Sequence, residues 1–132
     1  YSAQVRAAGH TIGNHTYDHK DLTGMSSDEA KKEMQTGPQS RCMRPPYGAT
    51  NDQVHATASD LNLRVVLWDV DPRDWATPGT DTIVSRVMAG ISDGAIILMH
   101  DGGGDRSESV AALDELLTKL SAKGYTFQSL DC

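Results

Sequence analysis

The sequence is poor in the features that mark several classes of protein. It has no apolar run near the ~20 residues that cross a bilayer, and no repeat, low-complexity tract or long linker. Its 12 Lys and Arg are outnumbered by 18 Asp and Glu, and the net charge of −6 argues against nucleic acid or an anionic membrane surface as the main partner. A length of 132 residues suits one domain with a core of its own, and we predict a monomer.

Cysteine is also scarce, since only Cys42 and Cys132 are present. A bond between them would close a loop of ~90 residues, nominally worth ~4–5 kcal/mol in the chain-entropy model. Two independent thiols, or a bond from Cys132 to a cysteine upstream, are the alternatives. Geometry alone decides among the three, so the sequence leaves the pairing open.

Helix and strand patterns alternate along the chain. Capped or amphipathic stretches predict helices, and apolar or extended runs predict five strands. In the helix over residues 107–124, Val110, Leu113, Leu116, Leu117 and Leu120 are expected on one buried face. The pattern indicates an α/β fold with a parallel sheet covered by helices. Five strands are too few to close a β/α barrel, so either the sheet is open or strands are missing from the front. A first helix is expected to end at Gly9. The other expected helices span 26–35, 50–63, 80–91 and 107–124, and the expected strands 10–13, 41–48, 64–68, 94–99 and 125–130.

Polar side chains follow the ends of four expected strands. Residues at the carboxyl ends of parallel strands share one rim of a sheet or barrel, so we expect these segments to meet. His15 and His19 follow the first strand, in a stretch typical of a loop rather than a helix. Imidazole is the commonest metal ligand, and two histidines with one carboxylate leave an open position for water on Zn²⁺. The spacing therefore favours a metal site, and solvated loop histidines are the alternative.

The stretch from Arg44 to Gly48, RPPYG, ends the second expected strand. Arg44 would bring a fixed cation to the rim, able to hold a carboxylate in a bidentate grip. The two prolines stiffen the following turn, so the backbone N–H of Tyr47 could be aimed as an oxyanion donor. A rigid surface turn with an isolated arginine is the other reading.

Two further segments carry acids, tryptophans and a histidine. In WDVDPRDW, Asp74 is the best candidate for a functional acid, while Asp69 and Asp71 are expected to cap loops. Trp75 could form an apolar wall of a groove. In ILMHDGGG, His100 ends a buried strand and could act as a positioned general acid or base.

Together these segments resemble the NodB-homology polysaccharide deacetylases, carbohydrate esterase family four. HTYDH is similar to the metal motif, RPPYG to the arginine-proline-tyrosine motif, DVDPRDW to the acid-tryptophan motif and LMH to the closing leucine-x-histidine motif. Their order and approximate spacing agree over nearly the whole chain. The family's first motif, a Thr-Phe-Asp-Asp-Gly strand end that supplies the catalytic base and the third metal ligand, is absent. The stretch from His19 to Arg44 is also shorter than in the family. We therefore expect a C-terminal portion of such a domain.

The resemblance implies a distorted (β/α) barrel, here without its N-terminal strands, and a Zn²⁺-dependent deacetylase, with Co²⁺ as another possible metal. His15 and His19 would bind the metal, Arg44 would steady the base and the Tyr47 N–H would meet the oxyanion. Asp74 would orient His100, the general acid. The residues expected to contact substrate are Trp75, Leu98, Pro45 and Tyr47.

An acetylated polysaccharide is the expected partner, in a secreted or cell-wall setting. Peptidoglycan N-acetylglucosamine, chitin and acetylated xylan all present an acetyl group beside a sugar ring, so the polymer stays open. A different metallohydrolase, and a non-catalytic or truncated carbohydrate-binding domain, are the competing interpretations.

Overall fold

The computed structural model describes residues 1–132. Contacts divide the chain into two compact units, of which unit 1 comprises Tyr1–Leu67 with Gln128–Cys132 and unit 2 comprises Trp68–Phe127. Our expectation of one domain over residues 1–132 stays a prediction. No helix is long and apolar enough to cross a membrane.

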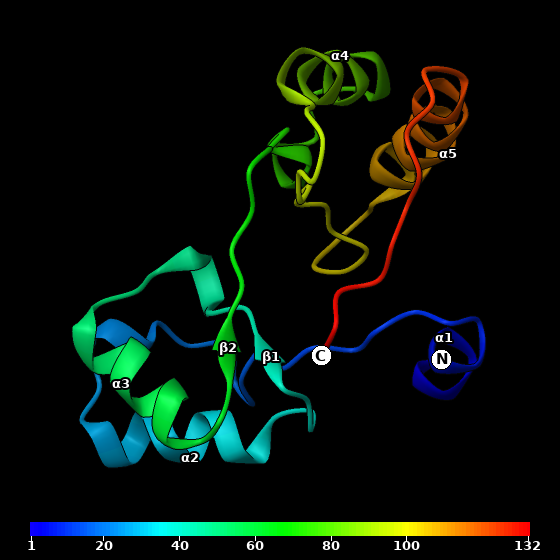
Figure 1. The fold of residues 1–132 in the computed structure, drawn as a ribbon. Helices are drawn as coiled ribbons and strands as arrows, with labels where there is room; N and C mark the ends of the chain where they lie inside the picture. The colour runs from blue at the N-terminus through cyan, green and yellow to red at the C-terminus, as the bar shows by residue number, and fades with distance from the viewer. The chain divides into compact units, whose positions relative to one another are not determined.

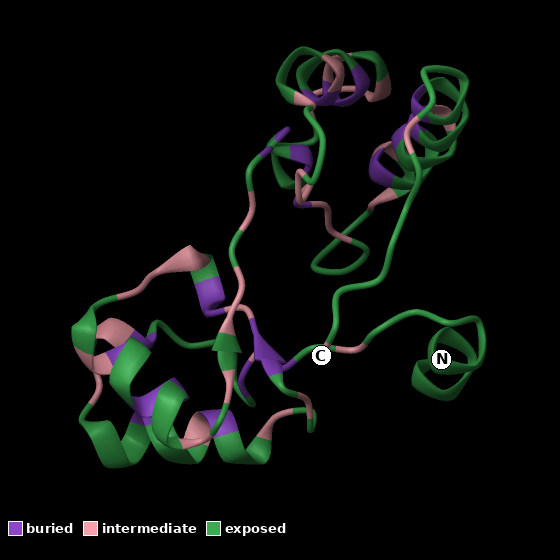
Figure 2. Ribbon diagram, viewed as in Figure 1, coloured by how far each residue is buried: buried purple, intermediate pink, exposed green.

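Unit 1 is built from short helices around a small parallel sheet (Figure 1). Ser26 caps α2 through a capping box with Glu29, and Asn51 caps α3, so both helices begin where the capping signals predict. α2 packs against α3, and the buried positions gather on short stretches of these helices and of β1 (Figure 2). The elements are α1 (Ser2–Ala7), η1 (Leu22–Gly24), α2 (Ser27–Thr36), β1 (Cys42–Met43), η2 (Pro46–Gly48), α3 (Asp52–Asp60) and β2 (Arg64–Val65).

The strand pairs of unit 1 are parallel, as the alternation of helices and strands predicts. β1 pairs with β2 in the register Cys42 to Arg64, and Asn14 forms an isolated parallel bridge with Met43 on the other side. This arrangement brings the segment before His15 alongside the segment before Arg44. The core beneath it consists of Leu22, Ala30, Met34, Met43, Val54 and Ala58.

Unit 2 contains η3 (Asp74–Ala76), α4 (Thr80–Gly90) and α5 (Ser107–Ala122). Val70 and Ile97 form an isolated parallel bridge, in which the Leu98 N–H donates to the Val70 carbonyl at 2.9 Å. α4 and α5 pack against each other over this pair. The core residues are Val70, Ile83, Val84, Val87, Ala112, Leu116 and Leu120.

Regular strand is shorter than the sequence predicts. Only Arg64–Val65 of the expected 64–68 strand and Cys42–Met43 of 41–48 form a ladder, and 94–99 contributes an isolated bridge at Ile97. The prediction of a strand over 10–13 is wrong, because the bridge of this segment lies at Asn14, one residue beyond it. The prediction of a strand over 125–130 is wrong, because these residues have no regular structure. A run of apolar residues indicates that a segment is buried. A strand ladder also requires a neighbouring strand whose backbone groups form hydrogen bonds with it.

The buried face of α5 also differs from the prediction. Leu116 and Leu120 are buried, but Val110, Leu113 and Leu117 are 61%, 46% and 41% exposed. The buried stripe runs through Ser109, Ala112, Leu116 and Leu120. α5 packs on α4 through this single stripe, so the apolar residues one position beyond it lie outside the contact.

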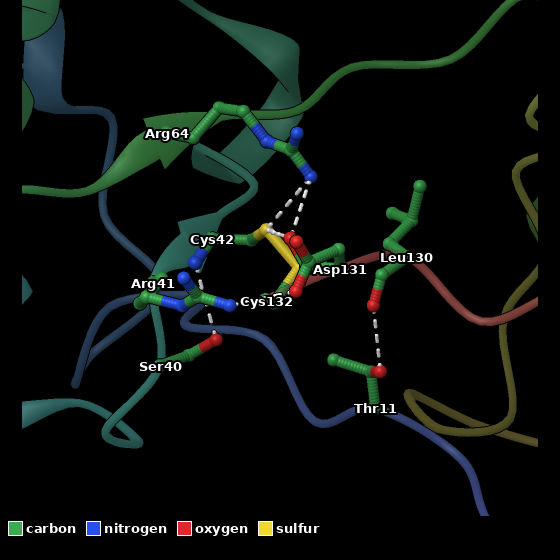
Figure 3. The surroundings of a disulfide bond; sticks show 8 residues. All are labelled: Thr11, Ser40, Arg41, Cys42, Arg64, Leu130, Asp131 and Cys132. Atoms are coloured by element: carbon green, nitrogen blue, oxygen red, sulfur yellow. Dashed lines mark hydrogen bonds and ion pairs between the residues drawn. A yellow bond between two sulfur atoms is a disulfide. The ribbon is translucent and has the colours of Figure 1, made fainter.

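The two cysteines form an internal disulfide. Cys42 and Cys132 are bonded with their Cα atoms 5.3 Å apart, which settles the pairing that the sequence left open. Figure 3 shows the bond among polar contacts to the end of the chain. Arg41 pairs with the Asp131 carboxylate at 2.6 Å, and an Arg64 N–H donates to the Asp131 carbonyl at 2.9 Å. The last residues are thereby attached to β1 and β2.

Candidate active site

The histidine pair lies on a loop that follows Asn14. The rings of His15 and His19 are 4.8 Å apart, edge to face, and the His19 ring lies 4.9 Å from that of Tyr47. His15 Nδ1 is hydrogen-bonded to the backbone carbonyl of Arg44. A carbonyl can only accept, so Nδ1 carries the proton and Nε2 carries the lone pair, which is the tautomer of many metal-ligating histidines.

Asn14 anchors the start of this loop. It is 3% exposed, and its side-chain amide donates to the carbonyls of Met34 at 2.7 Å and Pro38 at 2.9 Å. Its side-chain oxygen accepts the Thr16 N–H at 2.9 Å. All of the polar atoms of this buried amide are therefore used to shape the backbone on either side of His15. Asn14 directly precedes the histidine motif in the sequence, and this position is the one local signal of its role.

The RPPYG turn lies beside the histidine loop within unit 1. Pro45 and Pro46 are buried, and the Gly48 N–H donates to the Pro45 carbonyl at 3.0 Å. Tyr47 has φ of 60° and is 71% exposed. The Arg44 N–H donates to the Asn14 carbonyl at 2.9 Å, so backbone pairing brings together the arginine and histidine segments. The roles expected for the Arg44 guanidinium and the Tyr47 N–H stay predictions.

In unit 2, Asp74 and His100 form a hydrogen-bonded pair. His100 Nδ1 lies 2.8 Å from Asp74 Oδ1, and the His100 backbone N–H donates to Oδ2 at 2.8 Å. Ser109 Oγ donates to Oδ2 at 2.7 Å, from the first turn of α5. Asp74 is fully buried, while the His100 side chain is 31% exposed. The carboxylate therefore orients the imidazole through Nδ1 and leaves part of the ring accessible to solvent. A general acid or base needs both properties.

Two opposing effects set the acidity of Asp74. Burial raises the pKa of Asp74. The hydrogen bonds from the His100 side chain, from Ser109 and from the His100 backbone lower it, and so does the charge of His100. The net pKa lies below the usual carboxyl value. Asp74 is therefore an anion at neutral pH. Ser109 was missed from the sequence, yet its spacing to Ala112 and Leu116 places it on the buried stripe of α5.

The remaining predicted residues of unit 2 differ in exposure. Trp75 is 47% exposed, and the Arg73 guanidinium lies 5.2 Å from its ring centroid, a cation–π distance. Leu98 is 6% exposed. Asp71 accepts the Arg73 N–H at 2.8 Å, which confirms the expectation that it caps its loop. Asp69 accepts the Ile96 N–H at 2.8 Å and so holds a neighbouring segment in place.

The histidine pair provides the candidate donors for a metal. The structure contains no group of three or more His, Cys, Asp or Glu side chains arranged to hold a metal ion. Two adjacent imidazoles, one with its tautomer set by a backbone carbonyl, fit the nitrogen ligands that Zn²⁺ prefers. His15, His19, Arg44 and Tyr47 belong to unit 1, and Asp74, Trp75, Leu98 and His100 to unit 2. Their union in one site stays a prediction.

The sequence of this chain is similar to those of known proteins. A family model for polysaccharide deacetylases matches residues 2–66. A peptidoglycan-N-acetylglucosamine deacetylase of Bacillus cereus is 40% identical over 94% of this chain and 63% of its own length. A chitooligosaccharide deacetylase of Azorhizobium caulinodans is 33% identical over 98% of this chain and 71% of its own. The chain therefore belongs to the polysaccharide deacetylase family.

A solved structure supports the same assignment. A CE4 family pseudoenzyme from Bacillus anthracis is 35% identical and superposes with a TM-score of 0.83, over 93% of this chain and 46% of that chain. The present chain thus spans less than two thirds of the Bacillus cereus relative and about half of this solved chain. The predicted fold class and the family resemblance are both confirmed by these matches.

Proposed function

We propose that this chain serves the hydrolytic removal of acetyl groups from a polysaccharide, with N-acetylglucosamine units of peptidoglycan or chitin as the substrate. The observation that carries the proposal is the held imidazole of His100, backed by buried Asp74, in a member of the deacetylase family. Two relatives bear names that specify N-acetylglucosamine or chitooligosaccharide deacetylation. The overall reaction converts an acetamide and water into acetate and an amine.

We further propose that His15 and His19 bind Zn²⁺, or Co²⁺ in its place. Zinc supplies a Lewis acid and lowers the pKa of a bound water from ~15.7 toward ~7. The His15 tautomer supports this role, since its Nδ1 proton is held by the Arg44 carbonyl. We propose that the third ligand and the carboxylate base come from the family's Thr-Phe-Asp-Asp-Gly motif, which residues 1–132 do not contain.

The residues of this chain have distinct tasks in the proposed reaction. Arg44 steadies the base, and the Tyr47 N–H donates to the developing oxyanion, a contact worth ~3–4 kcal/mol when well aligned. His100 delivers a proton to the leaving nitrogen, and Asp74 stabilises the imidazolium before the transfer. Trp75, Leu98 and the Tyr47 side chain contact the sugar and the acetyl methyl, whereas Pro45, which is fully buried, supports the turn that carries Tyr47.

The disulfide supports a location outside the cytosol. Bonds such as Cys42–Cys132 persist in oxidising compartments and are rare where thiols are kept reduced. We propose a secreted or cell-wall-associated protein that acts as a monomer on its polymer.

Acetate release tests the proposal. A protein that carries residues 1–132 together with the family's first motif is incubated with zinc and N-acetylated peptidoglycan or chitooligosaccharide, and acetate is measured enzymatically. His100→Ala should lower the rate at least about 100-fold, the scale of a general acid, while bound zinc is unchanged. His55→Ala, an exposed position on α3, is the matched control and should keep the wild-type rate. Normal turnover by His100→Ala would remove His100 from the mechanism.

The second candidate function is glycan binding without catalysis. A CE4 family pseudoenzyme is among the similar structures, and the present chain has no three-residue metal group of its own. Tight binding of chitooligosaccharide with no acetate release, with or without zinc, would favour this candidate. Acetylated xylan is tested as a further substrate, for O-deacetylation. Acetate release from xylan but not from peptidoglycan or chitooligosaccharide would mean that xylan, and not the proposed polymer, is the substrate.

A further inference from the structure

The loop between the two histidines has an unusual backbone. Thr16 and His19 have φ values of 66° and 56°, in the left-handed region that residues other than glycine rarely occupy. The His19 N–H donates to Thr16 Oγ1 at 3.1 Å, which closes the loop on itself. Such a conformation persists only when surrounding groups hold it.

One carboxylate holds the middle of this loop. Glu33 Oε2 accepts the N–H of Tyr17 at 3.2 Å and the N–H of Asp18 at 3.0 Å. The Glu33 side chain is 13% exposed and comes from α2. Lys20 Nζ bonds Asp18 at 2.7 Å and lies 3.9 Å from Glu33 Oε1. A single oxygen atom therefore holds two of the peptide groups that lie between His15 and His19.

We propose that Glu33 is a positioning residue for the His15–His19 pair, acting by its two backbone hydrogen bonds rather than by its charge. This inference rests on the proposed zinc-binding role of the pair. With the loop held, the imidazoles keep their separation of 4.8 Å before metal arrives, and binding does not have to order the backbone. Loss of an outer contact of this kind typically weakens metal affinity 10–100-fold.

Two conservative substitutions of Glu33 distinguish the effect of its side-chain length from the effect of its charge. Glu33→Gln removes the charge but keeps an amide oxygen at the same distance from the backbone, able to accept both N–H groups. Glu33→Asp keeps the charge but is one methylene too short to reach both. Gln35→Ala, exposed on the same helix, is the control.

Zinc affinity and amide exchange together test the proposal. Zinc dissociation constants are measured by competition with a chromophoric chelator for the wild type and the three variants, each carrying the family's first motif together with residues 1–132. Hydrogen exchange at Tyr17 and Asp18 is followed by NMR without metal, and thermal unfolding checks the fold. We expect Glu33→Asp to weaken zinc binding about 10–100-fold and to accelerate exchange at both amides. Glu33→Gln and Gln35→Ala should remain near wild type.

Three results would overturn the inference. Weakened binding in Glu33→Gln with normal binding in Glu33→Asp would mean that charge, not reach, matters. Accelerated exchange in Glu33→Asp with unchanged zinc affinity would reduce Glu33 to a structural role, while the proposed function survived. A wild-type chain that binds no zinc would refute the metal role of the pair, and the positioning role would fall with it.

Discussion

Asp74 is a buried carboxylate whose hydrogen-bond donors come from two residues, His100 and Ser109. Since its pKa is lowered in the folded chain, it contributes stability at pH values above the unfolded carboxyl pKa of about 3.9. That contribution is lost as the pH falls through the lower folded pKa, because the protonated carboxyl no longer attracts these donors as strongly. The same contacts that orient His100 thus make unit 2 sensitive to acid.

Asp74→Asn tests this sensitivity. The amide cannot accept every bond that the carboxylate accepts, so we expect a loss of about 1–3 kcal/mol in the free energy of unfolding at pH 7. The gap to wild type should close as the pH falls through the lowered pKa. Urea unfolding followed by tryptophan fluorescence measures it, since both tryptophans belong to unit 2.

Asp93→Asn, at an exposed turn of the same unit, is the control for the change of charge. It should unfold like wild type at every pH. An Asp74→Asn gap that stayed constant down to strongly acid pH would contradict the assigned pKa shift.

At the scale of elements, the end of α2 lies against the histidine loop. Gly37 follows the helix, and a Cβ there would come within 2.9 Å of Asn14 Nδ2 and of the Thr16 carbonyl oxygen. Its φ of −74° suits any residue, so glycine is required by space and not by backbone conformation. The helix end and the histidine loop are therefore packed without room for a methyl group.

Gly37→Ala should destabilise unit 1 by about 1–3 kcal/mol, the usual cost of overpacking. Thermal unfolding followed by circular dichroism gives the change. Gly24→Ala is the matched control, because a Cβ at Gly24 meets no atom within 4 Å. Equal melting of the two variants would show that the Gly37 contact relaxes freely.

At the scale of the whole molecule, unit 1 is discontinuous in sequence. The chain leaves it after Leu67 and returns at Gln128, and the disulfide closes the connection across 90 residues. Ser129 Oγ donates to the Gly9 carbonyl at 2.8 Å and Thr11 Oγ1 donates to the Leu130 carbonyl at 2.9 Å, so the returning segment also contacts residues near the start of the chain. Oxidation of the cysteines therefore stabilises a unit whose parts are distant in sequence.

Reduction of the disulfide, or Cys42→Ser with Cys132→Ser, should lower the free energy of unfolding by up to about 4–5 kcal/mol. We expect amide protection to fall in α2 and α3 while α4 and α5 keep theirs, because both cysteines belong to unit 1. Hydrogen exchange with and without a dithiol reductant measures the effect. Equal loss of protection in α4 and α5 would show that the two units unfold together.

The sequence alone determined the helices, the parallel pairing and the family. Capping residues such as Ser26 and Asn51, and apolar spacing along each helix, act over a few residues, so they can be recognised locally. The spacing of His15 to His19 and the order of the four motifs identified the family for the same reason, since each motif is a short contiguous stretch.

Only the tertiary structure decided the features that join distant residues. Three such features link positions between 15 and 90 residues apart. They are the disulfide from Cys42 to Cys132, the hydrogen bond from Ser109 to Asp74 and the hydrogen bonds from the histidine loop to Glu33. The extent of the strands and the buried stripe of α5 likewise depend on the neighbours available. A residue's type limits the contacts it can make, but the path of the folded chain decides which partner comes within reach.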